Sequence, residues 1–139
     1  MGATPALQMA HGIGHALTVW AGWLCLAAAL LGAVLAVLQL RSGGPPPVPW
    51  PVGALHGLLG AAGLALLVLA LRYPDAAAPP GTGGFRLAGA VVLGVALLGG
   101  LSILATRLRR GRFGSGLVGV HATLAITGLC ILAARLLAG

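Results

Sequence analysis

Val118-Gly-Val-His-Ala-Thr-Leu-Ala-Ile-Thr-Gly-Leu-Cys-Ile-Leu132 is an apolar stretch with a single ionisable side chain, His121. It matches an earlier stretch when the sequence is shifted by 65 positions. The shift pairs identical residues, namely His121 with His56, Leu124 with Leu59, Gly128 with Gly63, Leu129 with Leu64 and Leu132 with Leu67. It also pairs small residues, Gly60 with Ala125 and Ala65 with Cys130. We interpret the chain as two copies of one hairpin built around the two histidines.

The composition identifies a membrane protein. The chain has 139 residues, of which 59% are hydrophobic and 6% charged, and its mean hydropathy is +1.06. A soluble domain carries about 25% charged residues. This chain lacks the polar surface of a soluble globule, whereas a bilayer accepts apolar surface as its contact with solvent. A soluble enzyme is therefore excluded.

The charged residues restrict the chemistry further. The net charge is +7, all eight basic residues are arginines, and Asp75 is the only acid. The arginines lie mainly at the ends of apolar runs, which indicates membrane orientation and not nucleic-acid binding. Catalysis by paired carboxylates is excluded, and a carboxylate proton relay is not expected. No catalytic constellation is evident, so we do not expect an enzyme beyond an electron-transfer subunit.

Four apolar runs predict an all-α fold, a four-helix transmembrane bundle in a single membrane domain over residues 1–139. The predicted spans are 20–40, 51–71, 85–105 and 117–137. Proline-rich and glycine-rich segments separate the first three, and a short basic segment separates the last two. Because every connection is short, sequential helices should be antiparallel neighbours.

The arginines predict the orientation. One side of the membrane carries Arg41, Arg107, Arg109, Arg110 and Arg112, and the other carries Arg72, Arg86 and Arg135. Positively charged connections stay in the cytoplasm. We therefore expect both termini on the extracytoplasmic side of a bacterial cytoplasmic (inner) membrane.

The repeat predicts where the histidines lie. The same shift maps Trp20–Leu40 onto Phe85–Ala105, so the chain consists of two helical hairpins of equal orientation. Such repeats are related by a pseudo-two-fold axis along the membrane normal. This symmetry places His56 and His121 at the same depth on opposite sides of the bundle centre, roughly 6–9 Å inside their helix starts.

Small residues accompany both histidines. Gly60 and Gly63 follow His56 by four and seven positions, and Ala125 and Gly128 follow His121 in the same way. These spacings put them on the histidine faces. Small residues let helices, or a flat cofactor, approach closely, and ordinary helix packing explains them equally well.

An ionisable group inside the membrane is a functional-site hypothesis by default. Two neutral imidazoles at one depth, facing one centre, match the needs of a six-coordinate haem iron. We therefore assign His56 and His121 as candidate haem b ligands, with Gly60, Gly63, Ala125 and Gly128 making room for the ring. The arginines of the third connection lie at the same side and are candidates to pair with haem propionates.

Four spans and two histidines resemble the four-helix membrane b-type cytochromes that serve as quinone-linked subunits of bacterial dehydrogenases. His121-Ala-Thr-Leu-Ala125 also resembles small bacterial membrane proteins. The first resemblance implies an electron-transfer subunit with other membrane subunits as partners. Those cytochromes commonly carry two haems or a longer chain, and the third span here contains no histidine. The resemblance therefore does not extend to a second bis-histidine haem.

Three alternatives remain. The protein is a non-redox accessory subunit whose histidines make interhelical hydrogen bonds, or it holds a bacteriochlorophyll-type pigment on one histidine. A small transporter is the weakest alternative, because the spans contain no acid and few polar groups.

Two further residue pairs need a role. His11 and His15 are four positions apart and share a helix face, which suits a metal or anion contact at the membrane surface. Because no third ligand is nearby, we favour an interfacial lead-in to the first span, next to an aromatic belt of Trp20 and Trp23. We interpret Cys25 and Cys130 as small hydrophobic residues and expect neither a disulfide nor a metal site there.

Overall fold

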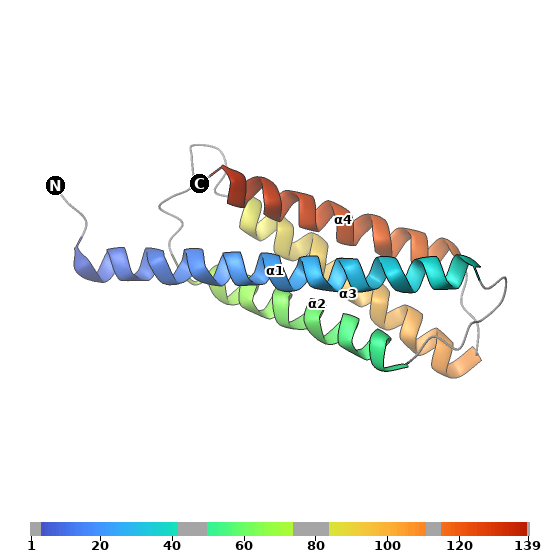
Figure 1. Ribbon diagram of the computed structural model, residues 1–139. Helices are drawn as coiled ribbons and strands as arrows, with labels where there is room; N and C mark the ends of the chain where they lie inside the picture. Colours follow the sequence, from blue (N-terminus) through green and yellow to red (C-terminus); the bar gives the residue numbers. More distant parts are fainter. Residues whose placement is uncertain (1–3, 42–49, 74–83, 111–114, 139) are drawn as a thin grey trace.

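A computed structural model describes residues 4–41, 50–73, 84–110 and 115–138, and 95% of these residues are helical, with no strand among them. The helices are α1 (Pro5–Arg41), α2 (Trp50–Ala70), α3 (Phe85–Arg110) and α4 (Ser115–Leu137) (Figure 1). All four are long and apolar enough to cross a membrane. The predicted all-α four-helix membrane bundle is confirmed.

Two helices extend beyond the predicted spans. α1 begins at Pro5 and not near Trp20, because no proline follows Pro5 before the end of the helix and proline is well suited to a first helical turn. Because each residue of an α-helix adds a fixed rise, the 37 residues of α1 make it about 55 Å long. It therefore exceeds the thickness of a bilayer core, and its first turns project past the other helices (Figure 1). α3 also continues to Arg110, past the predicted end at residue 105.

The helices form two hairpins that lie side by side. α1 packs extensively along α2, and α3 packs extensively along α4. The smaller contacts of α1 with α4 and of α2 with α3 join the hairpins, so α2 and α4 occupy diagonal positions. Both of these helices begin at the same end of the bundle (Figure 1). This is the arrangement expected for two repeats of equal orientation.

The register inside each hairpin refines the predicted repeat. A Cβ atom at Gly63 would lie 2.7 Å from Sγ of Cys25, and one at Gly128 would lie 2.7 Å from Cγ of Leu93. Gly63 and Gly128 differ by 65 positions, whereas Cys25 and Leu93 differ by 68. The predicted mapping of Trp20–Leu40 onto Phe85–Ala105 is therefore wrong by three residues. The physical reason is that the second hairpin is three residues shorter toward its tip than the first.

One layer of side chains forms the apolar centre. It contains Ala21, Leu67, Ala90 and Leu132. Leu67 and Leu132 are fully buried, and they are partners under the 65-residue shift. The outward faces carry large apolar side chains such as Leu58, Leu98 and Ile126. A surface of this kind suits contact with lipid.

Candidate functional site

His56 and His121 lie close together across the bundle, and both side chains are half-buried. Each lies six residues after the first residue of its helix, Trp50 for α2 and Ser115 for α4. Each is thus about 9 Å along its helix. The ring centroids are 5.9 Å apart and the ring planes are at 87° to each other. The predicted meeting of the two histidines across the diagonal is therefore present in the structure.

Each imidazole is held by the other helix of its own hairpin. Nδ1 of His56 lies 2.8 Å from the carbonyl oxygen of Ala28, and Nδ1 of His121 lies 2.8 Å from that of Ala96. A carbonyl oxygen only accepts hydrogen bonds, so Nδ1 of each ring must be the protonated nitrogen that donates. In a neutral imidazole this leaves the lone pair on Nε2.

Glycines on α1 and α3 accommodate the rings. A Cβ atom at Gly32 would lie 2.9 Å from Cε1 of His56 and 3.2 Å from its Nδ1. A Cβ atom at Gly100 would lie 3.1 Å from Cε1 of His121, and one at Gly99 would lie 3.7 Å from its Cβ. A side chain at Gly32 would require the ring of His56 to shift, and one at Gly100 would be in tight contact with the ring of His121. The sequence does not predict these glycines as neighbours of the rings, because they lie on other helices and follow no histidine at helical spacing.

The small residues predicted to make room for a cofactor have other contacts. Gly60 faces Ala28, where an added Cβ would lie 3.8 Å from the alanine methyl carbon. Gly63 and Gly128 face Cys25 and Leu93, as described above. These three glycines therefore bring the helices of each hairpin together. Ala125 is half-buried on α4, one turn beyond His121.

A second polar pair lies two turns beyond the histidines, toward the tips of the hairpins. Gln39 follows Gly32 by seven residues, and Arg107 follows Gly100 by seven residues, so each shares a face with its glycine. Both side chains are half-buried. They occupy equivalent positions under the 68-residue shift of α1 onto α3. Among the arginines of this end whose side chains the structure describes, Arg107 shares the face of α3 turned to His121.

The other arginines at this end of the bundle are exposed, or their side chains lie outside the described part of the chain. Arg41 and Arg109 are exposed. Arg110 ends α3, and Arg112 lies outside the described residues. Of Arg41, Arg107 and Arg109, Arg107 is the one that is half-buried.

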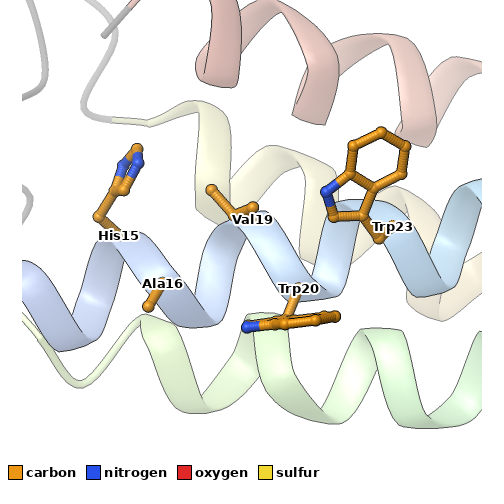
Figure 2. A pocket seen from close by; sticks show the side chains of 5 residues that line it. All are labelled: His15, Ala16, Val19, Trp20 and Trp23. Carbon is orange, nitrogen blue, oxygen red and sulfur yellow. The ribbon is translucent and has the colours of Figure 1, made fainter.

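His11 and His15 lie in the N-terminal turns of α1, far from the histidine pair. His15 is about 26 Å along α1 from Gly32. It borders a shallow surface hollow with Ala16, Val19, Trp20 and Trp23 (Figure 2). All of these residues come from one helix, and Trp20 and Trp23 are more than half exposed. The hollow therefore lies on the outer surface of the bundle.

The described residues contain no group of three or more metal-ligating side chains. Cys25 and Cys130 are both free, the first buried against Gly63 and the second exposed on α4. His56 and His121 are thus a two-ligand arrangement. Such a pair is suited to an ion whose other ligands come from a bound cofactor.

Comparisons with protein families, curated proteins and solved structures found no match to this chain. The functional assignment accordingly rests on the geometry of the bundle and its side chains.

Proposed function

We propose that this protein is an integral membrane subunit that binds haem b between His56 and His121 and transfers electrons. The observation that carries the proposal is the pair of Nδ1 hydrogen bonds to helix carbonyls. Histidines that bind metals commonly donate their other ring N–H in this way, because the bond fixes the tautomer and raises the basicity of the ligating nitrogen. Nε2 of each ring would be the iron ligand.

The spacing of the rings supports the same assignment. Metal–nitrogen bonds of about 2.0–2.1 Å on opposite sides of one ion bring two imidazole centroids to roughly 6 Å apart. The centroids of His56 and His121 are 5.9 Å apart. Perpendicular ring planes allow both nitrogens to address one ion, and they also allow direct edge-to-face contact of the rings.

The packing of the bundle supports insertion of a flat ring. Contact between the hairpins is less extensive than contact inside each hairpin. A macrocycle would therefore separate the hairpins at a smaller cost in lost contacts than it would separate the helices of one hairpin. Arg107 would pair with a propionate, and the apolar helices would exclude water. Haem supplies one-electron transfer when bound.

A non-redox accessory subunit is the second candidate, favoured by the same hydrogen bonds. In this case His56 and His121 connect the helices of each hairpin, and their rings contact each other across the bundle. Interhelical hydrogen bonds in membranes contribute about 0.6–2 kcal/mol each. In a variant of this role, one histidine would hold a bacteriochlorophyll-type pigment.

Other membrane subunits are the proposed partners in both cases. We infer a bacterial cytoplasmic membrane with both termini extracytoplasmic, since the arginines near the tips of the hairpins outnumber those at the other end. The apolar outward faces supply the surface on which lipid or another membrane helix packs.

The test is the visible spectrum of the protein purified in detergent. We expect a Soret band and sharp α and β bands on reduction, and we expect His56→Ala and His121→Ala each to remove this low-spin spectrum. His11→Ala is the matched control and should leave it intact, because His11 lies in the N-terminal turns of α1, far from His56 and His121. A colourless wild-type protein that folds would refute the haem assignment and favour the accessory role, and a far-red band would identify a bacteriochlorin.

A further inference from the structure

The two imidazoles lie against matching pairs of residues on the neighbouring helices. Ala28 and Gly32 are four residues apart on α1, and Ala96 and Gly100 are four residues apart on α3. Residues at this spacing lie one above the other on the same helix face. We call each pair an imidazole cradle. The two cradles differ by 68 positions, which is the shift that relates α1 to α3 in the structure.

Each cradle contacts its imidazole at two places. The carbonyl oxygen of the alanine lies 2.8 Å from Nδ1 in both hairpins. A Cβ atom at the glycine would lie nearest to Cε1, at 2.9 Å for His56 and 3.1 Å for His121, followed by Nδ1 and then Nε2. The hydrogen bond fixes the direction of Nδ1, and the glycine backbone lies along the Cε1 edge of the ring. Together these contacts restrict rotation of the ring about its Cβ–Cγ bond.

The angle between the two rings does not follow from the repeat alone. The planes of His56 and His121 are at 87° to each other. A two-fold axis relates the rings but leaves this angle free, because the angle depends on how each ring is inclined to the axis. The contacts that determine this inclination come from the cradle inside each hairpin. The nearly perpendicular arrangement is therefore built separately by the two cradles.

The angle has a consequence for an iron ion that both rings ligate. Each imidazole interacts through its π orbitals, which are perpendicular to the ring plane, with one of two iron d orbitals. Perpendicular rings act on these two orbitals equally, whereas parallel rings act on the same orbital and separate the two energies. The axial ligands are one of the means by which a protein tunes a haem iron. A purely structural pair of histidines has no need of a particular angle.

We propose that the two cradles are positioning residues that hold the axial imidazoles perpendicular to each other at the haem iron, an inference that rests on the proposed haem function. The cradles act through His56 and His121, whose Nε2 atoms would ligate the iron. Perpendicular rings keep the two d orbitals close in energy, and ferric haem then gives a strongly anisotropic electron paramagnetic resonance signal with one large g value. Parallel rings give a rhombic signal with three resolved g values.

The test is low-temperature electron paramagnetic resonance of the full chain in detergent, loaded with ferric protoporphyrin IX. We expect the strongly anisotropic low-spin signal from wild type. In Gly32→Ala the ring of His56 must move, because the new methyl group would lie 2.9 Å from its Cε1. Since 87° is already close to a right angle, turning either ring lowers the angle, and the signal should shift toward the rhombic form. Gly57→Ala is the matched control and should keep the wild-type signal, because a Cβ atom there meets nothing within 4 Å.

Gly100→Ala provides a second variant in case Gly32→Ala does not fold or does not bind haem. Its methyl group would lie 3.1 Å from Cε1 of His121, so it should shift the signal in the same direction by a smaller amount. A colourless wild-type protein would refute the proposed function and this inference with it. A wild type with the visible spectrum of low-spin haem but a rhombic resonance signal would overturn the cradle role alone. The cradle role is also overturned if Gly32→Ala and Gly100→Ala both retain low-spin haem with the wild-type resonance signal.

Discussion

At the scale of single residues, the two imidazoles owe their orientation to backbone carbonyls. Ala28 and Ala96 supply acceptors to Nδ1 at the same distance, 2.8 Å, in both hairpins. The bonds direct Nε2 away from these carbonyls and leave it as the nitrogen able to accept a proton or a metal. A haem site and a purely structural contact both need this tautomer. The two hydrogen bonds therefore fix the orientation of the rings, which either role requires.

The glycines beside the rings give a prediction at this scale. In Gly32→Ala, the new methyl group would contact the imidazole of His56 at 2.9 Å. Overpacking of this kind costs about 1–3 kcal/mol. The control is Gly57→Ala, because a Cβ atom at Gly57 meets nothing within 4 Å. Both changes gain the same helix propensity, about 1 kcal/mol.

We therefore expect the free energy of unfolding of Gly32→Ala to be about 1–3 kcal/mol below that of Gly57→Ala. The measurement is reversible unfolding in mixed micelles, followed by circular dichroism. Gly100→Ala should behave like Gly32→Ala, since its methyl group would lie 3.1 Å from His121. Equal stabilities of Gly32→Ala and Gly57→Ala would show that the ring does not pack against α1 at this position.

The sequence predicts one part of this site, the pair of histidines, and not the glycines beside them. The repeat predicts that His56 and His121 meet, because both lie on helices that the 65-residue shift relates without error. It does not predict Gly32 or Gly100 as their neighbours. That contact depends on how α1 registers against α2, and the register is decided by packing of Ala21 and Cys25 on Gly63. The spacing of residues along the chain does not reveal such a contact between two helices.

At the scale of elements, the hairpins are equivalent in packing although they differ in length. Three residues are close to one helical turn, so shortening the second hairpin by three leaves nearly the same face of α3 against α4. Cys25 and Leu93 consequently occupy the same place in the two hairpins, against Gly63 and Gly128. The four helices are predictable from length and hydropathy alone. The three-residue difference is not, because residues rich in Leu, Gly and Ala match each other at several offsets.

The basic end of α3 gives a prediction at the scale of elements. Arg107, Arg109 and Arg110 belong to α3, and Arg112 lies outside the described residues. Each would interact with anionic headgroups by about 1 kcal/mol near the surface. Replacing all four by glutamine should produce mixed insertion, measured with reporter fusions to the C-terminus.

Arg41→Gln is the control for this change. It removes one arginine from the same side and leaves the other four, so it should keep a single topology. If the fourfold variant also keeps a single topology, the end of α3 does not determine orientation, and the hydropathy of the spans must do so.

At the scale of the whole molecule, the two ends of the bundle are chemically different. The histidine pair lies about 9 Å from the start of α2. Ala70, whose carbonyl oxygen accepts a hydrogen bond from buried Arg86, lies about 21 Å farther along that helix. The apolar layer of Leu67 and Leu132 separates these sites, and the outward faces remain apolar over most of the length between them. The bundle therefore has a histidine pair toward one end and two buried arginines, Arg86 and Arg135, toward the other.

At this scale we predict which end of the bundle faces the cytoplasm. The positive-inside rule places the tips of the hairpins in the cytoplasm, and with them the histidine end. In a background with Cys25 and Cys130 replaced by alanine, a membrane-impermeant thiol reagent applied to intact cells should label Ala138→Cys. It should leave Ser42→Cys and Ser115→Cys unlabelled until the cells are permeabilised; Ser42 lies outside the described residues, and Ser115 begins α4. Efficient labelling of both serine positions in intact cells would reverse the orientation, and the histidine end would then face the extracytoplasmic side.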